Sequence, residues 1–182
     1  MFWSFRHQIT RQTALDCLVQ FALFLSSLKP EHIYITQETG TLSTVHYHIP
    51  ISKETGEFVH EQHIPFRLTP NMITLMGPIS LSGPMVFSMI AAARCLIDPK
   101  LGTEAILAAI LKDEVQASIK DMTEPRVISM IEDIQSAVNQ IMSRLQTAAN
   151  FDKAESKLPS IISLTTTPEN LCRLDPAWYP WL

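Results

Sequence analysis

A single stretch, Ile64–Ile97, limits what this 182-residue chain can fold into. It holds four of the twelve prolines and then becomes the most apolar segment of the sequence. Proline fixes φ and removes a hydrogen-bond donor, so the beginning of the stretch must form rigid corners and short elements. Thr69 followed by Pro70 predicts the start of a short helix, because threonine caps helices and proline suits their first position. Gly77-Pro78 predicts its end.

A second, strongly apolar helix is predicted from Ser82-Gly83-Pro84 to Asp98-Pro99. Its apolar residues recur every three or four positions, with little charge anywhere but Arg94. A helix this apolar belongs in the centre of a fold, and we expect neighbouring helices to pack around it. The apolar positions are Met85, Val86, Met89, Ile90, Ala93, Leu96 and Ile97.

Two motifs carry a family resemblance. The string PFRLTPN, followed by SGPM and the apolar helix, resembles the C-lobe of the phosphatidylinositol-3-kinase-related kinases. Within that family it is similar to the pseudokinases of the TRRAP/Tra type, and the last residues, LCRLDPAWYPWL, are similar to their FATC tail. The resemblance runs over nearly the whole chain. It implies a structural role for the first motif, whose residues are Pro65, Phe66, Arg67, Leu68, Thr69, Pro70 and Asn71.

The resemblance also implies the fold class, which is mainly α (α+β). Residues 1–149 would form the C-lobe of a phosphatidylinositol-3-kinase-like fold, incomplete at its N-terminus, with a short β-hairpin. Residues 150–182 would form a small helical FATC domain.

Composition agrees with a globular chain and narrows its chemistry. Hydrophobic residues make up 46% and charged residues 18%, so a large core is expected. A net charge of -4 argues against a nucleic-acid surface. The three cysteines are too far apart for a disulfide frame or a zinc site, and we expect buried or partly buried thiols in a reducing compartment. The sequence contains no run of about 18 apolar residues, so it predicts no membrane span.

Before the central stretch, the spacing of apolar residues changes from that of a helix to that of a strand. Trp3–Leu28 is helical in pattern and is expected to end at Lys29-Pro30. His32–Thr36 and Ser43–Ile51 read as two strands around a turn at Glu38–Thr41.

After the central stretch, Thr103 and Pro125 each predict the start of a helix. In the second of these, apolar residues alternate at spacings of four and three, which is the seam of a coiled coil or the buried face of a long core helix. We expect 151–167 to be a linker and Glu169–Leu174 to be a short helix. The seam residues are Val127, Ile131, Ile134, Val138, Ile141, Leu145 and Ala148.

The catalytic groups of an active kinase are missing. An active relative needs a D-R-x-x-x-N loop and then D-F-G, whose oxygens orient the attacking hydroxyl and hold magnesium. By order and spacing these positions fall at Ser27, His32 and His46, and no aspartate lies between Leu18 and Phe66. Imidazoles are poor magnesium ligands. The sequence also lacks a glycine-rich phosphate loop, so we expect no enzyme activity and no cofactor.

The histidines leave two alternatives open. His32, His46 and His48 could converge on zinc or copper, because two histidines two apart on a strand share a face. The alternative is a solvated strand edge with hydrogen-bonded imidazoles, which we favour because no fourth ligand has a suitable spacing.

The aromatic C-terminus is the best candidate binding site. Trp178, Tyr179, Trp181 and Leu182 place a large apolar area on few residues, which suits docking to a partner or back onto this chain. The ending AWYPWL differs from the G-W-C-P-F-W type of active relatives, so we do not transfer the membrane or redox behaviour of their tails.

The resemblance finally implies a function. It implies a nuclear, non-catalytic segment of a transcription co-activator scaffold that helps to recruit histone acetyltransferase complexes, of the SAGA kind, to chromatin. The implied partners are protein subunits of those complexes and upstream helical repeats of the same full-length chain, with no direct nucleic acid and no membrane. The alternatives are a free-standing helical adaptor that dimerises through Val127–Ala148, or a kinase C-lobe.

Overall fold

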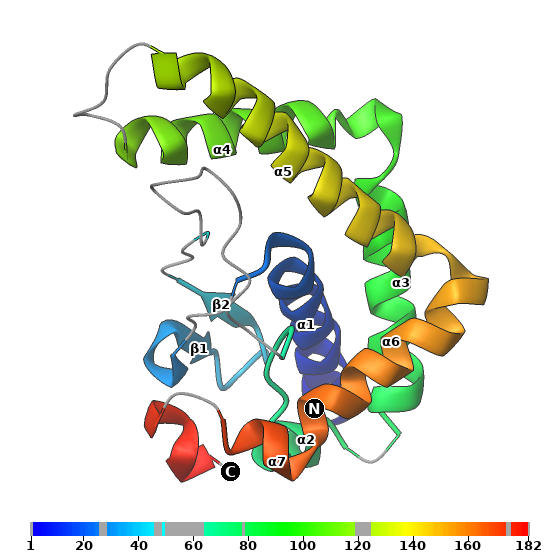
Figure 1. Cartoon of the computed structure of the whole chain (residues 1–182). Coiled ribbons are helices and arrows are strands. Elements are labelled where there is room, and N and C mark those ends of the chain that lie inside the picture. The colour runs from blue at the N-terminus through cyan, green and yellow to red at the C-terminus, as the bar shows by residue number, and fades with distance from the viewer. Residues whose placement is uncertain are drawn as a thin grey trace.

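The computed structural model describes residues 2–25, 29–45, 49, 64–77, 79–118, 125–173 and 176–181, and gives only the backbone for 116–118, 125–131, 151–156 and 181. Helices dominate this part of the chain, and one two-stranded antiparallel sheet lies near the N-terminus (Figure 1). The predicted mainly helical fold with a short hairpin is therefore confirmed.

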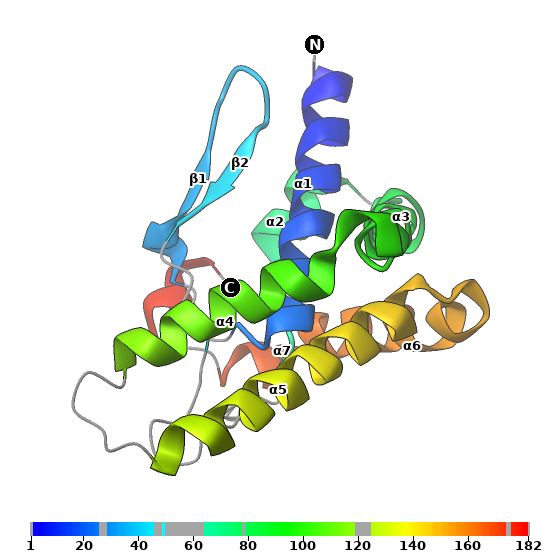
Figure 2. The same ribbon diagram turned by 90° about the horizontal axis from the view of Figure 1, so that it is seen from above.

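Three helices build the core: α1 (Phe2–Leu23), α3 (Val86–Leu96) and α5 (Pro125–Ala149). α3 packs against α1, α5 and the later helix α6 (Phe151–Thr166), which confirms that the apolar helix is central. In both views α1 lies between the hairpin on one side and α3 on the other (Figures 1 and 2). The residues of the central stretch that are at most 1% exposed in this core are Phe66, Leu68, Met85, Met89 and Ala93.

The rigid corners of the central stretch form as predicted. α2 (Pro70–Met76) begins after Thr69, whose hydroxyl oxygen accepts a hydrogen bond from the Met72 N–H at 3.5 Å. The helix ends at Gly77, where φ is +97°. The next helix opens with a π-helical turn, η2 (Leu81–Met85), because Pro84 carries no N–H and the Met85 N–H donates instead to the Ser80 carbonyl.

The end of α1 differs from the prediction. The helix stops at Leu23, not at Lys29-Pro30, because Phe24 adopts a left-handed backbone with φ of +57°. The Leu25 N–H then donates to the Gln20 carbonyl at 3.0 Å, the long-range bond of a Schellman motif. Glycine usually occupies this position, so the sequence offered no stop signal there.

The helices after α3 are joined by short connections. The turn η3 (Pro99–Leu101) leads into α4 (Thr103–Ser118), which packs against α5. The seam of α5 faces the core of this chain: four of its residues are buried and Ile134 is partly buried against them. The buried four are Val138, Ile141, Leu145 and Ala148.

The predicted linker at 151–167 is wrong, because this segment is the helix α6. Proline removes a single intrahelical hydrogen bond, and the helix continues through Pro159. Its buried residues Leu158, Ile162 and Thr165 recur at helical spacing and pack it onto the core. Arg94 of α3 fixes the preceding corner by donating from Nε to the Ala149 carbonyl at 3.0 Å.

The hairpin pairs β1 (Ile33–Ile35) with β2 (Leu42–Thr44), in the register Ile33 to Thr44 and Ile35 to Leu42. β1 is one residue shorter than predicted at each end, β2 begins at Leu42, and most of the predicted continuation over 46–51 lies outside the described residues. The predicted turn is confirmed, with Gly40 at φ of +73°.

Gly40→Ala should destabilise the protein by about 2–3 kcal/mol, because two costs add. A Cβ at Gly40 would lie 2.8 Å from the Phe5 carbonyl oxygen and 3.0 Å from its ring, in addition to the strain of the left-handed backbone. Gly102→Ala is the matched control, since Gly102 has a φ of +61° with nothing within 4 Å. Equal losses in denaturant titrations of the two variants would contradict the close packing of the hairpin turn on α1.

The cysteines correct the expectation of three buried or partly buried thiols. Cys17 is buried, but Cys95 and Cys172 are exposed. Burial raises the pKa of the Cys17 thiol, and the nearby Asp16 carboxylate raises this pKa further.

A thiol reagent should therefore modify Cys95 and Cys172 quickly in the folded protein and leave Cys17 unmodified until denaturant is added. Raising the pH from 7 to 9 should not recruit Cys17, because burial raises the pKa of its thiol. Mass spectrometry of the labelled peptides distinguishes the sites, and three equally fast thiols would refute the buried position of Cys17.

Among the described residues no single helix is long and apolar enough to cross a membrane. The residues of α2 and Leu81–Leu96 pass by length and composition only when taken together, and they are bent by 93°.

Candidate functional site

The structure describes one of the three degenerate catalytic positions. Ser27 and His46 lie outside the described residues, as does His48. His32 ends the short 3-10 helix η1 (Pro30–His32), directly before β1. The kinase-related resemblance places the metal-binding asparagine of active enzymes here.

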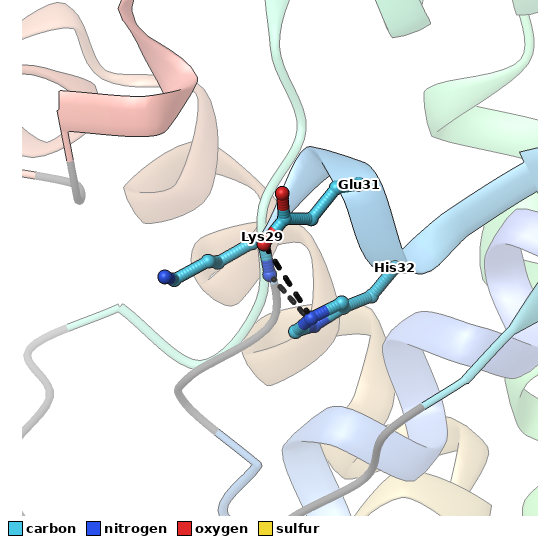
Figure 3. Close-up of polar contacts among 3 residues, drawn as sticks. All are labelled: Lys29, Glu31 and His32. Atoms are coloured by element: carbon cyan, nitrogen blue, oxygen red, sulfur yellow. Dashed lines mark hydrogen bonds and ion pairs between the residues drawn. The ribbon is translucent and has the colours of Figure 1, made fainter.

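The His32 imidazole is held by its local turn (Figure 3). The Lys29 backbone N–H donates to His32 Nδ1 at 3.5 Å, and His32 Nε2 lies 3.8 Å from Glu31 Oε1. Nδ1 thus caps the turn, while Nε2 faces a carboxylate whose side chain is 72% exposed. This geometry agrees with the hydrogen-bonded strand-edge alternative for His32.

Within the described ranges, no group of three histidine, cysteine, aspartate or glutamate side chains could hold a metal ion. The proposed convergence of His32 with His46 and His48 is not tested, because two of its three members lie outside those ranges.

Three polar residues on one face of α1 position the hairpin, and they were not predicted from the sequence. Thr44 Oγ1 donates to Asp16 Oδ1 at 2.9 Å, and Gln20 Nε2 donates to Asp16 Oδ2 at 2.6 Å. One turn earlier, the Leu42 N–H donates to Gln12 Oε1. The signal was present, because polar residues at 12, 16 and 20 interrupt an apolar helix at a spacing of four and therefore share one face.

A second unforeseen contact ties α5 to the end of α1. The guanidinium carbon of Arg144 lies 4.1 Å from the ring centroid of Phe21 and 3.8 Å from that of Phe24. Burial lowers the pKa of Arg144 to about 10, so the group stays charged at neutral pH and both ring faces compensate its partial desolvation. This contact gives a reason for a phenylalanine in a left-handed backbone, which ordinarily costs about 1–2 kcal/mol.

The C-terminal residues form a small second core. The helix α7 (Pro168–Leu171) and the turn η4 (Pro176–Trp181) bring Leu171 and Trp178 against Ile64, with Ile33 of β1 packed beside them. Trp178 is 3% exposed. The segment that resembles an FATC tail therefore contacts the hairpin and the beginning of the central stretch.

The PFRLTPN motif lies at this junction. Phe66 and Leu68 are buried in the main core, and Thr69 caps α2. Arg67 is 6% exposed, and its guanidinium carbon lies 5.3 Å from the Trp178 ring centroid, a cation–π contact. The motif thus reaches the main core and the C-terminal tail together, while Pro65 is half-buried and Pro70 and Asn71 are exposed.

The other aromatic residues of the tail are placed differently. Tyr179 is 53% exposed, while the side chain of Trp181 and all of Leu182 lie outside what the structure describes. Of the four predicted docking residues, Trp178 packs within this chain and Tyr179 faces solvent.

Comparison with known sequences gives long relatives that match the whole chain, although no family model matches it. The transformation/transcription domain-associated proteins of Danio rerio and Homo sapiens are each 37% identical over 198 residues, covering 100% of this chain and 5% of their own length. The SAGA complex/NuA4 acetyltransferase complex subunit TRA1 of Saccharomyces cerevisiae is 21% identical over 203 residues, covering 99% of this chain and 5% of its own. The chain thus spans about a twentieth of these relatives.

Comparison of the fold gives a match at lower identity. The solved structure described as the open conformation of CtTel1 matches with a TM-score of 0.64 at 19% identity, over 99% of this chain and 7% of that one. This likeness shows the fold alone. The sequence matches show the family: the chain belongs to the transformation/transcription domain-associated protein family and corresponds to one segment of its long members.

Proposed function

We propose that this chain is a non-catalytic pseudokinase segment of a transcription co-activator scaffold in the nucleus. The observation that carries the proposal is the match of its whole length to transformation/transcription domain-associated proteins. Two more distant relatives are named as subunits of the SAGA and NuA4 acetyltransferase complexes, and we transfer that setting to this chain. Its partners would be protein subunits of such complexes and helical repeats elsewhere in a full-length chain.

The degenerate catalytic positions support the non-catalytic part of the proposal. His32 supplies nitrogen where active relatives need a magnesium-binding oxygen, and its Nδ1 accepts a backbone N–H. Ser27 and His46 supply no carboxylate at the other two positions. Under the proposed division, residues 1–149 form the pseudokinase lobe and residues 150–182 the FATC domain, which docks through Trp178.

The adaptor alternative receives less support. Dimerisation through Val127–Ala148 needs an accessible seam, and the described second half of that seam is buried against other helices of the same chain. We therefore retain the scaffold proposal.

Magnesium-ATP should leave the melting temperature of the protein unchanged. A ligand at 100 times its Kd would add about 2.7 kcal/mol, which corresponds to a shift of about 5–10 °C for a chain of this size. Magnesium alone and ATP alone serve as controls. A saturable upward shift that needs both components would overturn the claim that the nucleotide site is lost.

The scaffold role is tested in the natural protein that contains this chain. Immunoprecipitation should recover acetyltransferase activity, and Trp178→Ala should reduce that recovery more than Tyr179→Ala if tail docking shapes the assembly. Precipitates with no acetyltransferase activity from the unmodified protein would refute the proposed setting.

A further inference from the structure

A cavity lies where α1, the hairpin, α2 and the C-terminal turn meet. Its volume is about 110 Å³, and it opens to solvent. A cavity of this size is smaller than a drug-sized site and holds about one aromatic ring, so a second ring of a ligand would lie at its mouth. Pro30 of the His32 turn lines the cavity, but Lys29, Glu31 and His32 do not.

The lining of the cavity selects for an uncharged ligand. Ile9, Ile33 and Leu42 form apolar walls from three elements, and none of the described lining residues carries a charge. Among the described lining residues, the polar groups are the hydroxyls of Thr13 and Thr69 and the indole N–H of Trp178. A charged group would lose its hydration here without gaining an ion pair, which costs several kcal/mol.

Three of the lining side chains favour an aromatic ring. Trp178 offers part of an indole surface, and aromatic pairs contribute about 0.5–1.5 kcal/mol beyond their buried area. Met72 and Met76 bring thioether sulfurs, which make favourable contacts with ring edges and adapt in shape to a ligand.

We propose that this cavity, bounded by α1, the hairpin, α2 and Trp178, is a binding site for a small uncharged aromatic molecule. Met76 belongs to the main core and Trp178 to the C-terminal segment, so the ligand would contact both. The proposal does not depend on the pseudokinase function.

The test uses 2-naphthol as the probe and 2-naphthoate as its charged counterpart, with the folded 182-residue chain. Methyl NMR of labelled methionine and isoleucine should show saturable shifts at Met72, Met76 and Ile33 with 2-naphthol. Exposed Ile106 and Ile110 on α4 should not shift. The Kd of 2-naphthol should lie below about 1 mM, and 2-naphthoate should bind at least about tenfold more weakly.

Leu75→Trp should fill the cavity and weaken 2-naphthol binding by at least about tenfold. Thr74→Trp is the matched control, because Thr74 is the exposed neighbour on the same helix and does not line the cavity. The proposal is overturned if 2-naphthol shows no saturable shift, if its shifts spread over α4, or if 2-naphthoate binds as well. The unmodified protein decides these outcomes even if Leu75→Trp fails to fold.

Discussion

Trp178→Ala should lower the free energy of unfolding by about 3–5 kcal/mol, which is the usual cost of removing a large buried aromatic side chain. The indole is 3% exposed, packs with Ile64 and Leu171, and lies 5.3 Å from the guanidinium carbon of Arg67. The loss should appear as a decrease of about 10 °C in melting temperature. It should also appear as faster hydrogen exchange in α7 and in the backbone around Ile64.

Tyr179→Ala is the control for this substitution, because Tyr179 is the next residue and is 53% exposed. Its effect should stay within about 0.5 kcal/mol. Trp178→Phe keeps a ring opposite Arg67 and should recover part of the loss. If Trp178→Ala were as mild as the control, the C-terminal turn would not be docked on the hairpin and the central stretch.

The second large effect concerns the α5 seam. Ile141 is 0% exposed and belongs to the main core, so Ile141→Asp would bury a carboxylate among apolar side chains. We expect a loss above about 5 kcal/mol, comparable with the whole stability of a typical domain, and hence an unfolded chain. The milder Ile141→Ala should cost about 2–5 kcal/mol. Circular dichroism and denaturant titration would measure both.

Ile141→Asp also distinguishes two interpretations of α5, as a core helix of this chain or as the seam of a dimer. Gln140→Asp adds the same carboxylate at the neighbouring, exposed position and should change stability by no more than about 0.5 kcal/mol. A dimer seam predicts that Ile141→Asp gives a folded monomer from a wild-type dimer. Light scattering coupled to size exclusion, together with circular dichroism, distinguishes that result from loss of the fold.

The sequence predicted those elements whose start or stop signals act locally. Thr69 with Pro70, Gly77 and Pro125 each bound a helix as expected, because capping and proline chemistry depend on adjacent residues. The spacing of apolar residues in α3 and α5 predicted their buried faces for the same reason, since period alone decides which side chains share a side.

What could not be predicted depended on residues distant in the chain. Phe24 ends α1 in a conformation that glycine usually adopts, and its ring packs on Arg144, which lies 120 positions later. The sequence predicted a linker at 151–167, but packing of Leu158 and Ile162 on the core keeps α6 helical through Pro159. Tertiary contacts outweighed local preference in both cases.

The candidate site also combines features that could be predicted from the sequence with features that could not. The absence of aspartate between Leu18 and Phe66 could be read from the sequence, while the assignment of Ser27, His32 and His46 to the catalytic positions stays a prediction. The packing of Trp178 against Arg67 could not be assigned in advance, since docking to this chain and docking to a partner need the same apolar residues.

The corner between α5 and α6 bears on how the C-terminal segment would behave under mechanical load. One residue, Asn150, separates the two helices, and the last carbonyl of α5 is bound by Arg94 from the central helix. The proposed domain boundary at 149/150 therefore coincides with a helix corner that Arg94 holds in place, and not with a hinge. Tension applied to α6 would be transmitted directly to α3, so displacement of the tail and displacement of the core would be mechanically coupled.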